Sequence, residues 1–366
     1  MAGEPVSRRD FLKAAGLGFA ASLSPAGAEE LSRADAVFAS AYSDKAGGFG
    51  AALLSEDGAV IASIPLPVRG HDVAHHHESG RAVAFARRPG TVAVAFDTAR
   101  NAPPRNIMAA PGRHFYGHGV YSPDGRLLYA SENDFDNAAG MIGIYDVGDG
   151  YRRIGELTSG GTGPHDMVLL GNGRSLAIAN GGIETHPDFG RTKLNLATME
   201  PCLCFVDCVH GTLLERQSLP KQLHQLSIRH LARIGHNGVY FACQYEGSQQ
   251  DHPPLCGHAE PGSSIRLFET EPGALAKLKN YIGSVAADPQ RGTLAITSPR
   301  GNCLLILDGK TGSVLRESNL ANVCGVAEGH RGYRATTGNG AIFDTAKGTI
   351  SNGSLQWDNH LLRISG

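Results

Sequence analysis

The 366-residue sequence lacks several features that would each indicate a particular class of protein. It has no apolar run of the ~18 residues needed to span a bilayer, and its formal net charge is only −2. Without a basic excess, nucleic acid is not an expected partner. No GxSxG, HExxH or Walker motif occurs, so no catalytic nucleophile stands out. No GxGxxG opens a helix and no strand–helix alternation recurs, which excludes the common parallel α/β folds.

Glycine and proline, by contrast, are abundant. The chain has 48 Gly and 19 Pro, and only 19% of its residues are charged, a composition typical of short strands joined by tight turns. The stretch 116–135 shows the local pattern. An apolar run headed by His118 leads to a Pro123-Asp124-Gly125 turn, and an alternating run follows. This order predicts a β-hairpin.

Variants of this hairpin recur along the chain, which indicates a repeat architecture. Glycine turns precede apolar runs at 82–85, 175–178, 239–242 and 293–296, and a later run in each unit closes on an acidic residue. Seven first strands can be counted, the last of them at 360–364. The N-terminal part supplies three strands, at 37–41, 50–54 and 60–66, that have no first strand. We therefore predict an all-β, seven-bladed β-propeller with four antiparallel strands per blade, closed by the C-terminal strand joining the N-terminal three.

The N-terminus has the order of an export signal. Residues 7–13 read SRRDFLK, a twin-arginine pattern, followed by a modest apolar segment and by Ala26-Gly27-Ala28, a typical cleavage site. We predict a signal peptide over residues 1–28, one propeller domain over 35–366, and a periplasmic location reached by the twin-arginine pathway.

Five histidines are predicted to head first strands, each followed two residues later by an apolar position. They are His71, His118, His165, His224 and His360. Because first strands line the central channel of a propeller, these imidazoles would form a ring suited to iron, copper or zinc. Asp72 and Asp166 each follow a ring histidine in the sequence. They are expected to serve either as further metal ligands or as hydrogen-bond acceptors that fix the imidazole tautomer.

The alternative is that these histidines only tie blades together by hydrogen bonds or through water. Ring nitrogens within about 5 Å of a common point would favour a metal, whereas a spread above about 8 Å would favour the structural role.

Two other stretches carry polar side chains. The long loop after Asn180 offers Glu184, His186, Asp188, Arg191, Lys193 and Asn195, and is predicted either to cover a channel mouth and bind a small ligand or to be held by its own contacts. The acidic stretch at Glu132, Asp134 and Asp136 is interpreted as a solvated turn, with acid/base catalysis or Ca²⁺ binding as the alternatives. Seven cysteines occur in the chain; those at 202, 204 and 208 are interpreted as small buried side chains rather than a thiolate site.

Several motifs together resemble an exported bacterial family of unknown function. They include GHGVYSPDG at 117–125, GPHDM at 163–167, GRTKLNL at 190–196 and QYEG at 244–247. The resemblance implies a seven-bladed propeller similar to quinoprotein and lactonase propellers. It also implies genes near imelysin-like iron-uptake proteins, and it identifies no catalytic residue.

The sequence therefore leaves three functions open. The first is a periplasmic protein that handles iron or copper through the channel histidines, with periplasmic iron-uptake components as partners. The second is a non-catalytic platform that binds a ligand or protein. The third, ranked lowest, is a metal-dependent lactonase-like hydrolase or a copper redox enzyme.

Overall fold

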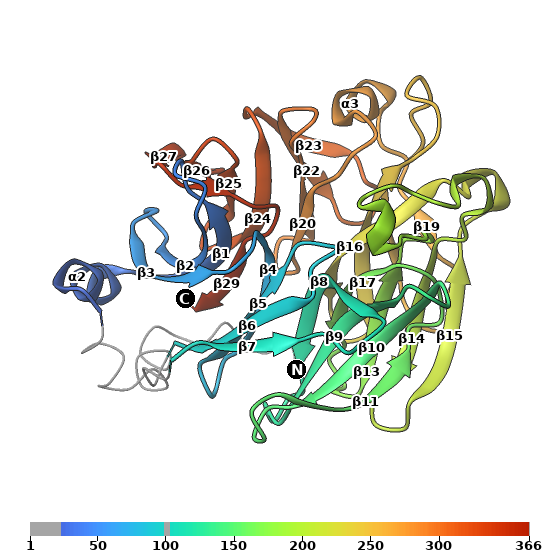
Figure 1. The fold of residues 1–366 in the computed structure, drawn as a ribbon. Helices are drawn as coiled ribbons and strands as arrows, with labels where there is room; N and C mark the ends of the chain where they lie inside the picture. The colour runs from blue at the N-terminus through green and yellow to red at the C-terminus, as the bar shows by residue number, and fades with distance from the viewer. Residues whose placement is uncertain (1–22, 99–102, 366) are drawn as a thin grey trace.

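A computed structural model describes residues 23–98 and 103–365, and its strands form seven sheets arranged in a ring (Figure 1). Each sheet is a blade of antiparallel strands, and the chain passes from blade to blade in sequence order. The predicted seven-bladed propeller is confirmed.

The ring closes within one composite blade, as predicted. Strand β1 pairs with β2 on one side and with two short C-terminal strands on the other, with Phe38 opposite Arg363 and Tyr42 opposite Trp357. The members of this blade are β1 (Val37–Ser43), β2 (Phe49–Ser55), β3 (Val60–Leu66), β28 (Gln356–Trp357) and β29 (Leu362–Ser365).

The other six blades each hold four consecutive strands, and the first strand of each lies on the channel side. The second and third blades are β4 (Gly70–His76), β5 (Arg81–Ala86), β6 (Val92–Asp97), β7 (Arg105–Met108), and β8 (Arg113–Tyr121), β9 (Leu127–Asp134), β10 (Ala139–Asp146), β11 (Arg152–Thr158). The fourth and fifth are β12 (Pro164–Leu169), β13 (Ser175–Asn180), β14 (Cys202–Asp207), β15 (Thr212–Ser218), and β16 (Leu226–Ile234), β17 (Gly238–Tyr245), β18 (Cys256–Ala259), β19 (Arg266–Leu267). The sixth and seventh are β20 (Ser284–Asp288), β21 (Thr293–Ser298), β22 (Cys303–Asp308), β23 (Val314–Asn319), and β24 (Val323–Gly329), β25 (Gly332–Thr337), β26 (Ala341–Asp344), β27 (Gly348–Asn352).

Helical segments in the described residues are short. They are α2 (Pro25–Arg33), α3 (Pro272–Leu278), η1 (Pro187–Phe189), η2 (Leu196–Thr198) and η3 (Lys221–Leu223). None of the described helices has the length and apolarity to cross a membrane. Helix α2 packs against the first blade through the buried Leu31 and includes the predicted cleavage position, whereas the twin-arginine stretch lies outside the described residues.

The hydrophobic core lies between neighbouring blades, so middle strands are buried on both faces. Strand β14 is buried at all six positions, which gives its cysteines the place of core side chains. All seven cysteines are buried free thiols. This agrees with the interpretation of Cys202, Cys204 and Cys208 as small buried side chains. The sulfur atoms of Cys202 and Cys204 lie 3.8 Å apart on the same face of the strand.

Candidate metal centre

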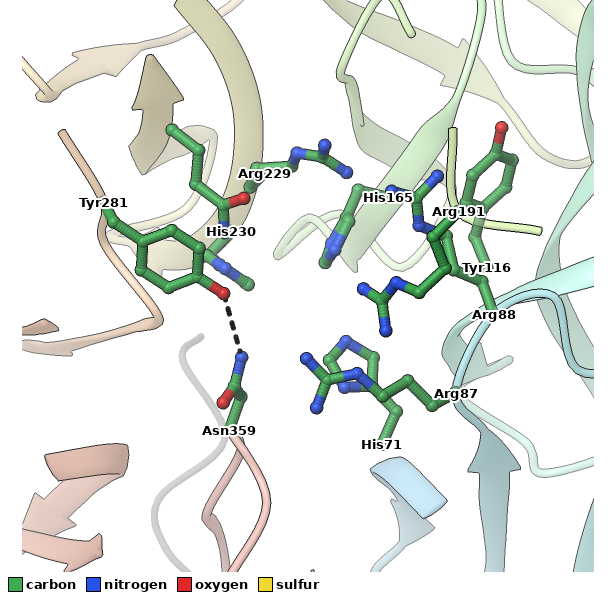
Figure 2. Close-up of a pocket in the computed structure, with 11 residues that line it drawn as sticks. His71, Arg87, Arg88, Tyr116, His165, Arg191, Arg229, His230, Tyr281 and Asn359 are labelled. Atoms are coloured by element: carbon green, nitrogen blue, oxygen red, sulfur yellow. Dashed lines mark hydrogen bonds between the residues drawn. The ribbon is translucent and has the colours of Figure 1, made fainter. Parts of the chain in front are cut away.

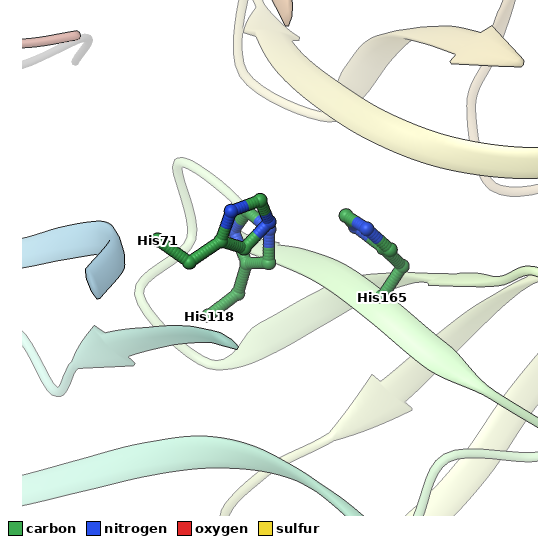
Figure 3. A group of neighbouring side chains, drawn as sticks. All are labelled: His71, His118 and His165. Atoms are coloured by element: carbon green, nitrogen blue, oxygen red, sulfur yellow. The ribbon is translucent and has the colours of Figure 1, made fainter. Parts of the chain in front are cut away.

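Five imidazoles from five blades meet in the channel. His71 lies in β4, His118 in β8, His165 in β12, His230 in β16, and His360 precedes β29. Their neighbouring ring centroids are 4.6 to 6.3 Å apart, and Figure 3 shows three of the rings side by side. The blades that contribute them are far apart in sequence, so only closure of the ring brings these side chains together.

Irregularities in strand pairing mark the histidine positions of four inner strands. The register shifts between Gly70 and Val73, Phe115 and Gly119, Pro164 and Asp166, and Ile228 and His230. A β-bulge breaks the strict alternation of a strand and redirects one side chain. The histidines can therefore face the channel while the residues after them remain in the core between blades.

Glycine at position 117 is required by the close approach of two blades. It has a φ of +108°, and a Cβ there would lie 2.5 Å from Cδ2 of His71. An L side chain would be strained at this φ and would displace the neighbouring imidazole. The Gly-His pair in β8 thus makes room for the His71 ring as well as supplying a histidine of its own.

Four of the five predicted ring histidines lie in this cluster, and the prediction of His224 is corrected. His224 lies at the end of η3, before β16 begins, and His230 holds the place in the fifth blade. The error arose because His224 stands two residues before the apolar Leu226, the same local pattern as the true ring histidines, although it lies at the end of η3. A signal was present: residues 230–234, HLARI, match residues 360–364, HLLRI, at all but one position.

The nitrogens are close enough to share an ion. One trio is His71, His118 and His165, another is His118, His230 and His360, and the ligand atoms within each trio lie within 4.8 Å of one another. For three atoms that lie at most 4.8 Å apart, the central point is at most about 2.8 Å from each atom. If each imidazole moved inward by less than about 1 Å, its nitrogen would reach the ~2.0–2.1 Å of a Zn–N bond to an ion at that point. His118 belongs to both trios.

Burial keeps these imidazoles neutral. It lowers the pKa of His360 to about 4 and holds the pKa values of His71, His165 and His230 well below their usual range. A proton on one ring would also repel a proton on its neighbour, which lowers the same pKa values further. Neutral imidazole is the form that binds metals, so at neutral pH no proton has to leave before an ion enters.

Carboxylates orient two of the rings. Nδ1 of His118 lies 3.1 Å from Oδ2 of Asp72 and 3.4 Å from Oδ1 of Asp166, and Nδ1 of His71 lies 3.2 Å from Oδ1 of Asp358. A proton on Nδ1 then donates to the carboxylate and leaves Nε2 with its lone pair, the usual arrangement behind a metal-bound histidine. Asp358 was not predicted from the sequence.

Five buried imidazole nitrogens of the cluster have no protein partner among the described residues. They are Nε2 of His118, Nδ1 of His165, both ring nitrogens of His230, and Nε2 of His360. Buried polar groups normally have a partner, since leaving one unpaired costs about 1–3 kcal/mol. The cluster is thus a set of donor atoms that the protein itself does not satisfy.

Asp72→Asn should weaken transition-metal binding by about 10- to 100-fold, because groups that orient a ligating histidine typically contribute that much. Titration with Cu²⁺ against a chelator of known affinity would measure the change. Asp188→Asn provides the control, since that carboxylate is 81% exposed and pairs with His186, which is not one of the five rings. Equal affinities for the two variants would remove Asp72 from the site.

The predicted ligand loop divides into two parts. Arg191 lines the cavity at one mouth of the channel (Figure 2), and Lys193 pairs with Glu246, which in turn faces Arg229. The other four residues hold the loop itself: the Asn195 side chain bonds the backbone of Glu184 and Gly182, and His186 pairs with Asp188. The loop thus contributes one cavity residue, and its remaining polar groups mainly serve its own structure.

The two sides of the histidine cluster differ in charge. On the side of the 180–200 loop, arginines and tyrosines line a small cavity of about 40 Å³. On the other side, Asp72, Asp166, His75 and apolar side chains line a larger one of about 360 Å³. A free cation would therefore approach the imidazoles more favourably from the carboxylate side.

Three comparisons with known proteins bear on this chain. A family model described as "Protein of unknown function (DUF1513)" matches residues 64–364, and no curated protein matches. Among solved structures, hydrazine synthase of Kuenenia stuttgartiensis is similar at 12% identity and a TM-score of 0.58, over 79% of this chain and 88% of that one. At that identity the likeness concerns the fold alone.

Proposed function

We propose that this chain, which belongs to the DUF1513 family of proteins of unknown function, binds a transition-metal ion through the histidine cluster in its channel. The observation that carries this proposal is the convergence of five neutral imidazoles, four of which have a buried nitrogen without a protein partner. Neutral imidazoles each present one lone pair, and lone pairs that face one another repel unless a cation or a hydrogen-bond donor lies between them.

The purely structural alternative is less well supported by the contacts. If the histidines only tied blades together, hydrogen bonds between rings would be expected. Among the described hydrogen bonds none joins two of these five imidazoles; the bonds of His71 and His118 run outward to Asp358 and Asp72. Carboxylates on the outer nitrogens and free inner nitrogens are the arrangement of a ligand set.

The donor set restricts the metal. Imidazole nitrogens favour copper, zinc, nickel and iron(II), whereas magnesium and calcium require mostly oxygen ligands. No cysteine belongs to the candidate metal groups among the described residues. The cluster thus suits iron and copper, the two metals predicted from the sequence. Zinc and cobalt are suitable probes.

The sequence supports an extracytoplasmic setting for this role. A twin-arginine signal would export the chain already folded, so a metal could be inserted before transport. Periplasmic iron-uptake components then remain the proposed partners, on the basis of the family resemblance.

Metal titration of the folded protein tests the proposal. The chelator-treated chain should bind Cu²⁺, Zn²⁺, Co²⁺ or Fe²⁺ at a defined stoichiometry, and the bound ion should stabilise it by about 2.7 kcal/mol at a free concentration of 100 Kd. Co²⁺ or Cu²⁺ spectra should show nitrogen coordination. A folded chain that takes up none of these ions would overturn the proposal and leave the histidines with a structural role.

A further inference from the structure

The channel mouth beside the histidine cluster is unusually rich in arginine. Arg87 and Arg88 follow β5, Arg191 comes from the loop between β13 and β14, and Arg229 lies in β16. In Figure 2, Arg87, Arg88 and Arg191 lie on the opposite side of the cavity from Tyr281 and Asn359, and Arg229 lies between the two sides. No acidic side chain belongs to the described lining of this cavity; its other members are His71, His165, His230, Tyr116 and Gln244.

The positive charge here exceeds the negative charge that the protein supplies. Asp358 accepts hydrogen bonds from both Arg69 and Arg87. Glu246 pairs with Lys193 and lies 3.9 Å from Arg229. Two carboxylates thus serve four cations, and no described carboxylate forms an ion pair with Arg88 or Arg191.

Two guanidinium groups each have a buried nitrogen without a hydrogen-bond partner. The side chain of Arg229 is only 5% exposed, and its Nε has no partner, nor has Nη1 of Arg88. Burial, followed by repulsion from Arg229, lowers the pKa of Arg88 to about 10, which is still far above neutrality. Buried charges are ordinarily paired. Arg229 has only a long ion pair of 3.9 Å to Glu246, which Lys193 shares, and Arg88 has no described carboxylate partner.

We propose that this arginine-lined mouth is a binding site for a small oxyanion that carries at least two negative charges, such as phosphate or a short dicarboxylate. Guanidinium groups bind such oxygens bidentately and gain strength where water is excluded. The hydroxyl of Tyr281 and the amides of Asn359 and Gln244 add neutral donors to the same cavity. Its volume of about 40 Å³ suits an anion of this size.

This site goes beyond the proposed metal binding and does not depend on it. The arginines and their missing counter-charge are features of the metal-free chain. Since His71, His165 and His230 also line the cavity, an anion bound here would lie next to the proposed metal ligands. Anion affinity measured with and without metal would reveal any coupling between the two sites.

Calorimetric titration of the chelator-treated full chain with phosphate and with oxalate, at low ionic strength, tests the inference. Wild-type protein should bind at least one of the two with a stoichiometry of one. Arg191→Gln and Arg229→Gln should each weaken that binding by about 10- to 100-fold, as expected for the loss of charge-assisted hydrogen bonds. The ratio of phosphate to oxalate affinity would then indicate which class of oxyanion the site prefers.

The matched control is Arg233→Gln, in the same strand as Arg229 but lining the cavities on the other side of the histidines. It should leave anion binding unchanged. Arg191 lies on a loop, so its variant stays informative even if Arg229→Gln misfolds, which circular dichroism would show. Failure of the folded wild type to bind either anion, or equal affinity in the Arg191 and Arg233 variants, would overturn the proposal whether or not the protein binds a metal.

Discussion

Replacing His118 with alanine should reduce transition-metal affinity by more than about 100-fold, the largest binding effect expected of any single substitution in the cluster. His118 is the one imidazole shared by both trios of ligand atoms, and its Nε2 is buried without a partner. Loss of a group that only orients a ligand costs about 10- to 100-fold, so loss of a ligand common to both trios should cost more. Competition titration with Cu²⁺ or Zn²⁺ measures the change.

The chain offers a sharp control for this experiment. His224 has the sequence features of a ring histidine but lies outside the cluster at the end of η3, so His224→Ala should retain wild-type affinity. His230→Ala removes a ligand from one trio only, so it should weaken binding less than His118→Ala but clearly more than His224→Ala. If the His224 variant lost the metal and the His230 variant kept it, the assignment of ligands from the structure would be wrong.

Glu132→Ala should lower the free energy of unfolding by about 3–5 kcal/mol, the usual effect of removing one partner of a buried ion pair. The Glu132 side chain is fully buried; it accepts a hydrogen bond of 2.6 Å from the Tyr145 hydroxyl and one of 2.8 Å from Nη2 of Arg153. Without it, the buried Tyr145 hydroxyl loses its acceptor and the Arg153 guanidinium loses its buried partner, keeping only the more exposed Glu156. Urea unfolding monitored by circular dichroism would give the difference.

Glu156→Ala is the matched control, because Glu156 binds the same Arg153 at 2.6 Å from a side chain that is 35% exposed. Exposed pairs contribute about 0–1 kcal/mol, so this variant should unfold close to the wild type. Both variants should keep their metal affinity, since neither residue belongs to the cluster. Similar unfolding midpoints for the two variants would show that burial does not set the strength of this interaction.

Glu132 also illustrates where interpretation of the sequence was wrong. The acidic stretch was interpreted as a solvated turn, and this holds only for its outer part. Strand β9 extends through Asp134 and carries Glu132 into the interior. An acidic residue beside turn formers gives no local sign that a tyrosine and an arginine from the next two strands of the blade will cover it.

Local patterns in the sequence are enough to predict the architecture. Strand alternation and turn chemistry are local properties, so the hairpin at 116–135 and its relatives predicted the blades, their number and the closure through 360–364. The sequence also identified four of the five clustered histidines, because each is followed two residues later by an apolar position in a recognisable first-strand run. His230 was missed because His224, six residues earlier, shows the same local pattern and was assigned to the fifth blade.

Which polar groups face one another depends instead on how the blades and loops pack in three dimensions. Arg88, Arg191, Arg229 and Asp358 come from separate blades and loops, and no spacing along the chain encodes their meeting at one mouth. Bulges in the inner strands and closure of the ring set which way each side chain points. The unpaired charges and nitrogens on which both proposals rest arise from that closure, because burial alone makes the absence of a partner costly.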